Sequence, residues 1–182
     1  MDQGAENYEK YQNGDMTGLE ALVRDYRHGL ILYIYGITSD MFLSEDLCED
    51  AFFHIMVKKP RYDGKSSFKT WLYRIGRNLA YDALRRQKII QFTELSDAEA
   101  DRASLEDGYI KTERQKVLHE QLKKLPQSEQ ELIWLSYFED MSAAEIGRLT
   151  GKSVGAAQKA LSRARQRLRE LMEKEGYGNE NE

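Results

Sequence analysis

The segment "SSFKTWLYRIGRNLAYDALRR", residues 66–86, is amphipathic with a helical period. Its apolar residues recur every three or four positions, as one buried helix face requires: Phe68, Leu72, Ile75, Leu79 and Ala83. We place a different set on the opposite face and its flank: Tyr73, Arg74, Arg77, Tyr81, Trp71, Asn78 and Arg85. A solvated face normally mixes Lys with Glu, so aromatic rings among arginines are not typical of an ordinary surface helix.

The composition is that of a soluble, helix-rich protein with one large or two small domains. The chain has 182 residues, 41% of them hydrophobic, and two prolines. Its longest apolar run, "LILYIYGI" at residues 30–37, is too short to span a bilayer, and the acidic start "MDQGAENYEK" lacks a secretory pattern. A single cysteine, Cys48, excludes an intrachain disulfide framework. We therefore expect a cytoplasmic protein without membrane insertion.

The net charge of −4 conceals two basic segments. Residues 65–88 hold seven basic side chains against one acid, and residues 151–172 hold six against one. Between them, residues 91–107 carry a local charge of −5, and residues 40–50 add five acids. Basic patches separated by acidic stretches favour binding to a polyanion at two places.

The pattern along the chain predicts an all-α fold of two small helical domains joined by a flexible acidic linker. We expect helices at about residues 19–37, 44–58, 66–86, 127–138, 142–149 and 153–171, with Ser44 capping the second. Helical order also resumes near residue 110, and Leu118, Leu122 and Leu125 lead to Pro126. "KKPRYDGKSS", residues 58–67, is a loop by its Pro and Gly. The predicted boundaries are 1–88 for the first domain, 89–116 for the linker, 117–175 for the second domain and 176–182 for a frayed tail.

The second domain contains the clearest motif, "MSAAEIGRLTGKSVGAAQKALSRARQRLREL" at residues 141–171. Ser142 and Glu145 have the spacing of a capping box. Gly147 permits close helix packing, Gly151 makes the turn and Ser153 caps the next helix. This order predicts a helix-turn-helix, whose second helix enters the major groove of DNA.

The second helix of this motif has separate packing and outer faces. The packing face consists of Val154, Ala157, Leu161, Ala164 and Leu168, and the outer face of Gln158, Lys159, Ser162, Arg163 and Gln166. Gln, Lys and Arg pair with base edges, whereas Arg165 and Arg169 suit phosphates. The alternative is an amphipathic hairpin with a charged, solvated face. We favour DNA binding because both caps, the turn glycine and the one-sided basic face coincide.

Four segments together resemble the successive regions of an extracytoplasmic-function sigma factor, a small two-domain group of the sigma-70 family. They are "GLEALVRDYRHGL", "SEDLCEDAFFHIM", the segment at residues 66–86, and "LPQSEQELIWLSYFEDMSAAEIGRLTGKSVGAAQKALSRAR". The resemblance covers nearly the whole chain. "FKTWLYRIGRN" and "SVGAAQKALSRAR", in this order and separation, form its most specific pair.

The resemblance implies that the first domain binds core RNA polymerase and opens the −10 promoter element. Tyr62 and Asn78 match the positions that receive a flipped base, and Arg74 and Arg77 would hold the non-template strand. The full expected −10 set is Tyr62, Gly64, Lys65, Trp71, Arg74, Arg77, Asn78 and Arg85. The aromatic residues among the arginines would then form a platform for single-stranded DNA. For Trp71, packing against neighbouring helices is the alternative.

The resemblance assigns the remaining parts as well. The expected −35 residues are Ser153, Gln158, Lys159, Ser162, Arg163 and Arg165. The expected contacts to the polymerase clamp helices are Asp46, Glu49, Asp50, Phe53 and Met56, although the acids also suit a solvated helix start. The linker resembles a segment that enters the polymerase cleft, with solubility as its alternative role. "LIWLSYF", residues 132–138, would offer a patch to the polymerase flap.

The recognition helix departs from the usual family pattern. Ala156 and Ala160 stand where Thr and Arg are customary, and Gln158 replaces a basic residue, so the −35 preference does not transfer. Gln158 has the geometry to favour adenine, but the base that it meets is open.

Other classes of function fit the sequence less well. The three histidines are scattered, and no phosphate loop, metal motif or catalytic triad is evident, so we expect no enzyme activity, metal or cofactor. A regulator that binds duplex operator without polymerase is the main alternative, and an adaptor for acidic proteins is a third. The resemblance also allows an anti-sigma partner.

Overall fold

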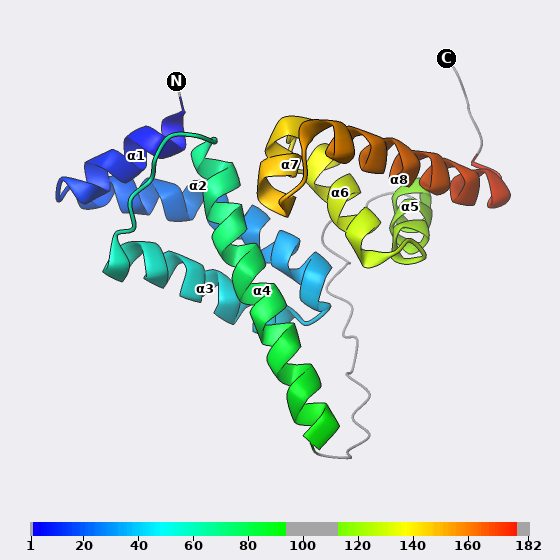
Figure 1. Cartoon of the computed structure of the whole chain (residues 1–182), viewed down its shortest axis with the longest axis horizontal. Helices are drawn as coiled ribbons and strands as arrows, with labels where there is room; N and C mark the ends of the chain where they lie inside the picture. The colour runs from blue at the N-terminus through cyan, green and yellow to red at the C-terminus, as the bar shows by residue number, and fades with distance from the viewer. Residues whose placement is uncertain (1, 94–112, 178–182) are drawn as a thin grey trace. The chain divides into compact units, whose positions relative to one another are not determined.

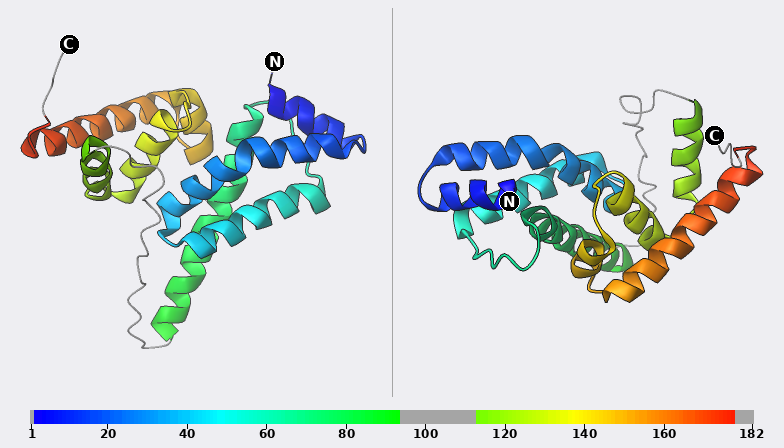
Figure 2. Two further views of the ribbon diagram at one scale, coloured as in Figure 1. Left: turned by 180° about the vertical axis from the view of Figure 1, so that it is seen from behind. Right: turned by 90° about the horizontal axis from the view of Figure 1, so that it is seen from above.

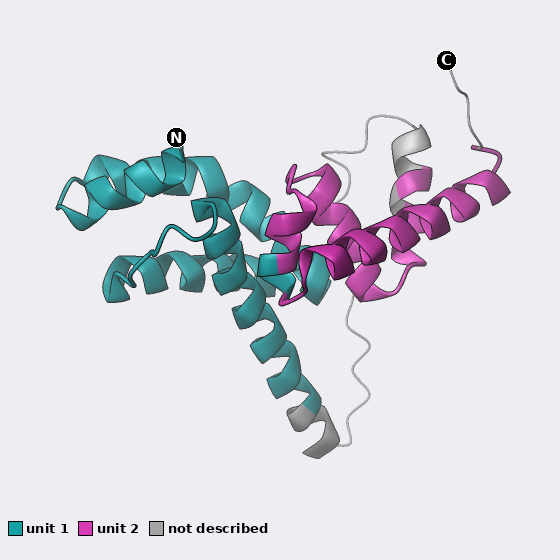
Figure 3. Ribbon diagram, turned by 45° about the horizontal axis from the view of Figure 1, so that its top comes forward, with its two compact units in different colours: residues 1–102, 148–150 teal, residues 103–147, 151–182 magenta. Residues whose placement is uncertain are grey.

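The computed structural model describes residues 2–93 and 113–177. Regular structure in these two ranges is entirely helical. The chain divides into two compact units, the first formed by residues 1–102 with the short segment 148–150, and the second by the rest (Figure 3). The predicted all-α fold is confirmed.

The described residues of the first unit form four helices, and those that follow residue 112 form four more (Figure 1). The helices of the first unit are α1 (Gln3–Gln12), α2 (Met16–Thr38), α3 (Met41–Lys58) and α4 (Phe68–Thr93). The others are α5 (Glu113–Lys123), α6 (Gln127–Tyr137), α7 (Ala143–Thr150) and α8 (Val154–Lys174).

Helix α1 is the element that the sequence pattern did not predict. Asp2 caps its amino end by accepting hydrogen bonds from the backbone N–H groups of Gly4 and Ala5. The helix lies alongside α2 in both views of Figure 2. The contact requires glycine at position 18, since a Cβ there would lie 2.2 Å from the carbonyl oxygen of Asn7.

Helix α3 begins three residues earlier than expected, because the predicted cap at Ser44 is wrong. Asp40 is the N-cap, and its side chain accepts a hydrogen bond from the backbone N–H of Leu43 at 3.0 Å. Ser44 is buried inside the helix instead, with its hydroxyl 2.8 Å from that of Thr38 on α2. Asp and Ser are both good caps, and burial decides which of them performs the role here.

Helix α4 packs on α2 and α3, and α1 covers its first turns. In Figure 1 the loop that precedes α4 passes beside the amino end of α1. Gly76 permits the close packing on α2, since a Cβ there would lie 2.8 Å from Leu30 Cδ1. The helix continues to Thr93, beyond the boundary expected at residue 88.

The second unit encloses an apolar core to which α5, α6, α7 and α8 contribute. Its buried side chains include Leu122, Leu125, Leu132, Ile133, Leu135, Met141, Ile146, Ala157, Leu161 and Ala164. Helix α5 begins at Glu113, before the boundary expected at residue 117. Most of the predicted linker (94–112) and most of the predicted tail (178–182) lie outside the described residues.

Neither a membrane-spanning helix nor a metal site is found in the described ranges. Within residues 2–93 and 113–177, no helix has the length and apolar character to cross a membrane. Over the same residues, no group of three or more His, Cys, Asp or Glu side chains is arranged to hold a metal ion.

Candidate nucleic-acid interface

The loop between α3 and α4, residues 59–67, holds Tyr62 against the start of α4. The Tyr62 ring lies edge-on to Phe68 and Trp71, with centroid distances of 5.8 and 5.6 Å. Its hydroxyl donates to the Ser66 carbonyl and lies 3.4 Å from Asp2 Oδ2. Burial, followed by the nearby Asp2 carboxylate, raises the pKa of Tyr62 to about 12. Tyr62 is therefore a neutral, half-buried ring in a fixed place.

Gly64 and Lys65 form the exposed tip of this loop. Gly64 has a φ of +68°, which favours glycine, and the backbone N–H of Lys65 donates to Asp63 Oδ1 at 3.1 Å. The same backbone hydrogen bond lowers the pKa of the Asp63 carboxyl. The Lys65 ammonium lies 3.5 Å from Asp63, so the loop tip carries a locally compensated charge.

Two aromatic residues that the sequence placed on the outer face or flank of α4 are buried. Tyr73 is 1% exposed and its ring stacks on that of Tyr33, so its predicted place on the outer face is wrong. Trp71 is 8% exposed, with its ring 5.4 Å from Tyr8 of α1 and 5.4 Å from Phe68. The packing alternative for Trp71 agrees with this burial. Helix α1 supplies the cover that the pattern of α4 alone could not reveal.

The exposed stripe of α4 is polar and mostly cationic. Arg74, Asn78 and Arg85 are exposed and share one side of the helix by their spacing. Arg85 forms an ion pair with Asp82, and the guanidinium of the half-buried Arg77 lies 4.5 Å from the ring centre of Tyr81.

The two residues expected to receive a flipped base are placed differently. Tyr62 contacts Trp71, whereas Asn78 lies seven residues further along α4, about 10 Å by the helical rise. Among the described contacts, none joins Tyr62 to Asn78. A base held by both residues would therefore have to span the surface between them.

The residues expected to contact the polymerase share the outer face of α3. The expected set is Asp46, Glu49, Asp50, Phe53 and Met56, and all five side chains are exposed. The helix also presents two large apolar residues that the sequence reasoning missed, Phe42 and Val57, which are 81% and 53% exposed. Apolar residues interspersed with the acids of this helix were the signal from which these two exposed positions could have been predicted.

A shallow groove runs between this face of α3 and α2. It has a volume of about 380 Å³, and Leu19 and Val23 of α2 line it together with Phe53 and Met56. Arg27 of α2 lies 3.7 Å from Glu49 of α3. The groove joins apolar walls to an acidic rim, a combination that suits a partner helix with apolar and basic residues.

The predicted turn geometry of the second unit is confirmed. Ser142 Oγ accepts from the backbone N–H of Glu145, and the Glu145 carboxylate accepts from the backbone N–H of Ser142. A Cβ on Gly147 would lie 2.8 Å from the carbonyl oxygen of Lys152, and Gly151 has a φ of +72°. Ser153 caps α8 through the N–H of Ala156 at 3.2 Å.

Helix α8 presents the whole of its expected outer face to solvent, Gln166 included. Gln158, Lys159, Ser162 and Arg163 are exposed, while Ala157, Leu161 and Ala164 are buried. Val154 was predicted to pack but is 48% exposed. It precedes the first residue of α8 that the core covers, so the packing face begins one turn later than expected.

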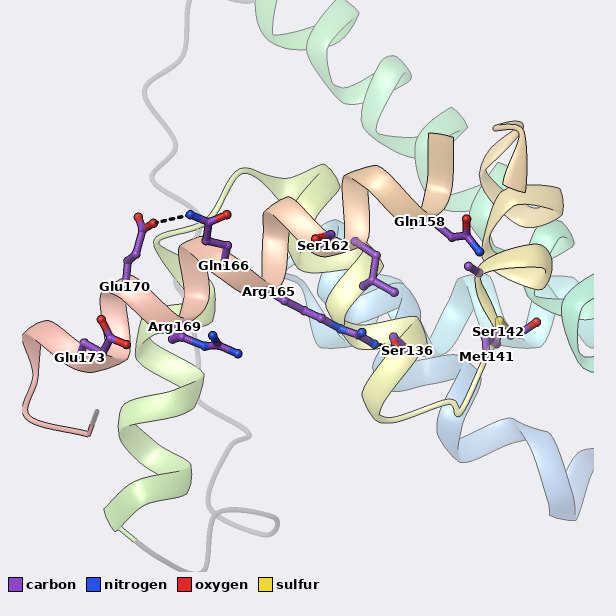
Figure 4. A pocket seen from close by; sticks show the side chains of 12 residues that line it. Ser136, Met141, Ser142, Gln158, Ser162, Arg165, Gln166, Arg169, Glu170 and Glu173 are labelled. Carbon is purple, nitrogen blue, oxygen red and sulfur yellow. Dashed lines mark hydrogen bonds between the residues drawn. The ribbon is translucent and has the colours of Figure 1, made fainter. Parts of the chain in front are cut away.

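Arg165 has protein contacts of its own. It donates to Ser136 Oγ at 2.8 Å, and its guanidinium lies 5.4 Å from the ring centre of Tyr137. In Figure 4 it extends from α8 toward Ser136 across a groove of about 870 Å³, which Gln158 and Ser162 also line. Arg165 thus remains exposed but is oriented by α6.

These features define a class of protein: an all-helical chain with a basic helix, packed against aromatic rings, in one unit and a helix-turn-helix in the other. Two family descriptions match it, Sigma-70 region 2 over residues 22–89 and Sigma-70, region 4 over residues 115–168.

Relatives match over most of their length. RNA polymerase sigma factor YlaC of Bacillus subtilis is 30% identical over 160 residues, covering 86% of this chain and 92% of YlaC. ECF RNA polymerase sigma factor SigW of the same organism is 27% identical over 172 residues, covering 88% and 92%. The chain therefore belongs to the sigma-70 family, in its extracytoplasmic-function group.

A solved structure has the same fold. The sigma factor RpoE from Bartonella quintana, in complex with the anti-sigma factor NepR, aligns with a TM-score of 0.69 at 23% identity, covering 90% of this chain and 98% of RpoE.

Proposed function

We propose that the chain binds core RNA polymerase through α3, opens the −10 element with the loop before α4 and α4 itself, and reads the −35 element with α8. As a sigma-70 family member of the extracytoplasmic-function group, it directs promoter-specific transcription initiation. One observation supports assigning −35 and −10 recognition to different units. The chain contains a complete helix-turn-helix, and separately a loop whose Tyr62 ring packs on Trp71 beside the arginine-rich helix α4.

The −10 role rests on the loop at residues 59–67 and the exposed stripe of α4. An unpaired strand binds to stacked rings and to a cationic track, and this surface combines Tyr62 with Arg74 and Arg77. Asn78 supplies amide hydrogen-bonding groups that a flipped base edge requires. Because Trp71 is 8% exposed, we assign it to supporting Tyr62 from below, with contact to DNA limited to its exposed edge.

The −35 role rests on α8. Gln158 and Lys159 lie near its amino end, where a helix enters the major groove most deeply, and both are exposed. Ser153 Oγ accepts the capping hydrogen bond from Ala156, so its expected DNA contact would use the hydroxyl hydrogen, as a donor, or the remaining lone pair. Arg165 and Arg169, both exposed, would supply phosphate contacts, which add affinity without sequence information.

The polymerase role rests on the groove between α2 and α3. Its apolar walls and exposed Phe42, Phe53 and Met56 offer a docking face of the kind that a partner helix covers. Exposed Tyr137 and Phe138 of the second unit provide the corresponding patch for the polymerase flap. We extend the proposal to an anti-sigma partner because the similar RpoE structure is a complex with one.

The test is reconstitution with core RNA polymerase on promoter templates. We expect the chain to co-purify with core polymerase and to give a promoter-dependent run-off transcript. Tight binding to duplex operator by the chain alone, with no transcript and no complex with core polymerase, would instead identify a helix-turn-helix regulator. A chain that binds acidic proteins but neither core polymerase nor DNA would be an adaptor.

A further inference from the structure

Helix α1 contacts both ends of the loop at residues 59–67. The Tyr11 hydroxyl donates to the Met56 carbonyl at 2.8 Å, in the last turn of α3. The Tyr8 hydroxyl donates to the Pro60 carbonyl at 2.8 Å, where the loop begins. Both carbonyls lie in or beyond the last turn of α3, where the helix cannot satisfy them itself, so these bonds also complete the end of α3.

At the other end of the loop, one carboxylate serves two helices. Asp2 Oδ1 accepts from the N–H groups of Gly4 and Ala5 at 3.1 and 3.3 Å, which caps α1. Asp2 Oδ2 accepts from the backbone N–H of Phe68, the first residue of α4. The Tyr62 hydroxyl lies 3.4 Å from the same oxygen. Asp2 therefore joins α1, the loop and α4 at a single point.

Side-chain packing also holds α1 against α4 near Asp2. A Cβ on Gly4 would lie 2.7 Å from Phe68 Cδ1 and 2.6 Å from the Tyr26 hydroxyl, so the backbone of α1 lies directly against α4. The Tyr8 ring lies 5.4 Å from both Phe68 and Trp71, the two rings that support Tyr62. The rings and the hydrogen bonds thus fix the same loop.

We propose that α1 and its cap Asp2 are positioning elements for promoter opening, which hold the loop at residues 59–67 in the conformation that receives DNA. The inference rests on the −10 role proposed above. It concerns residues before the Sigma-70 region 2 match, which begins at residue 22. A loop that is already ordered loses less conformational entropy on binding. By holding the loop, α1 and Asp2 would therefore favour capture of an unstacked base.

The test compares two caps of the first unit on holoenzyme assembled with core polymerase. Asp2→Ala removes the cap that touches the loop. Asp15→Ala removes the N-cap of α2, whose side chain bonds only to Thr17 among the described residues. Any affinity tag is placed at the carboxyl end. Permanganate reactivity of −10 thymines reports opening, and thermal unfolding and core binding are measured in parallel.

We expect Asp2→Ala to reduce opening about fivefold, the effect of losing a typical N-cap, at a temperature where the chain is folded and core binding is unchanged. Asp15→Ala should lower thermal stability comparably without this loss. The Asp2→Ala effect should also vanish in a Tyr62→Ala background, since the two residues would act through one loop. Tyr8→Phe removes only the hydroxyl that donates to the Pro60 carbonyl, so it should give a smaller loss of opening. This variant replaces Asp2→Ala in the test if Asp2→Ala does not fold.

The outcomes separate this inference from the function on which it rests. Normal opening by Asp2→Ala and Tyr8→Phe, with defective opening by Tyr62→Ala, overturns the inference and leaves the −10 role intact. Equal loss by Asp15→Ala and Asp2→Ala also overturns it, because the effect would then be general destabilisation. Normal opening by Tyr62→Ala overturns the −10 role of the loop, and the inference with it.

Discussion

The loop before α4 and the helix α8 hold their candidate DNA-binding residues in different ways. Tyr62 is half-buried, supported by Trp71 and Phe68, and its hydroxyl meets Asp2, a residue 60 positions away in the chain. Gln158 and Lys159 project from a regular helix and are exposed. Duplex DNA needs only a rigid face with the correct spacing, whereas an unstacked base needs a surface that several segments assemble. The first unit therefore depends on tertiary contacts where the second depends on local geometry.

The largest difference between the units is expected at high pH. Burial is the main factor that raises the pKa of Tyr8, Cys48 and Tyr62 to about 12, from ordinary values of 10, 9 and 10, and all three lie in the first unit. These groups ionise more easily in the unfolded chain, so their contribution to stability is complete below about pH 9 and is lost as the pH rises toward about 12.

Each unit contains one of the two tryptophans, which makes the comparison measurable. Fluorescence of Trp71 in a Trp134→Phe variant, and of Trp134 in a Trp71→Phe variant, follows the two units separately. Between about pH 8.5 and about pH 11.5 the melting temperature seen by Trp71 should fall more than that seen by Trp134. Cys48→Ala should move the onset from about pH 9 to about pH 10. An equal fall in both units would contradict the assignment.

Loss of the base-receiving residues should have the next largest effect. The double change Tyr62→Ala with Asn78→Ala should cost about 1–3 kcal/mol for each stacked base, while core polymerase binding stays intact. Permanganate reactivity of −10 thymines is the measurement. A template with a pre-opened mismatch bubble should restore transcription, because the strands no longer need to be separated. Undiminished reactivity on the duplex template would refute the pocket.

A single side chain of α8 should alter one base preference. Gln158→Glu removes the amide donor, so the preference at one −35 position should shift by about 1–3 kcal/mol in a selection over randomised elements with holoenzyme. Gln166→Glu is the matched control, since it makes the same charge change further along α8, where Gln166 bonds to Glu170 at 3.2 Å. A uniform loss with an unchanged motif would mean that Gln158 does not read bases.

The smallest effect is expected from a phosphate contact. Arg165→Ala should weaken −35 binding equally across sequences and reduce the salt slope by about one unit. Arg167→Ala makes the same change in charge, but Arg167 already lies 2.8 Å from Glu129, so its effect on the slope should be smaller. Equal slopes for the two variants would indicate that Arg165 serves only its contacts with Ser136 and Tyr137.

Local signals explain how much of the second unit could be predicted. The capping box joins residues three positions apart, and Gly151 and Ser153 follow within the same motif, so short-range spacing contains the whole turn. Even so, spacing could not show that Val154 lies beyond the core or that Arg165 is oriented by Ser136. Both depend on where other helices end.

The first unit was less predictable because its decisive contacts are distant in sequence. The apolar face of α4 was correctly placed at Phe68 and Leu72. How much more of the helix surface is buried depends on the neighbouring helices. One of these is α1, a short helix without a clear apolar stripe in its sequence. Tyr73 was therefore placed on the wrong face, and Trp71 could not be assigned between packing and DNA. The bond between Asp2 and Phe68 joins residues 66 positions apart, a separation that no local pattern reveals.

The far end of α8 has a mechanical consequence. Glu175, at its C-cap, accepts from Gln121 of α5 and from Lys124, each at 3.3 Å. Gln158 lies 17 residues away, about 25 Å along the helix axis. The core holds the amino half of α8 through Ala157, Leu161 and Ala164, and Glu175 holds its carboxyl end on α5. The helix is thus supported at both ends, so the exposed side chains of Gln158 and Lys159 keep a fixed place relative to the core of the second unit.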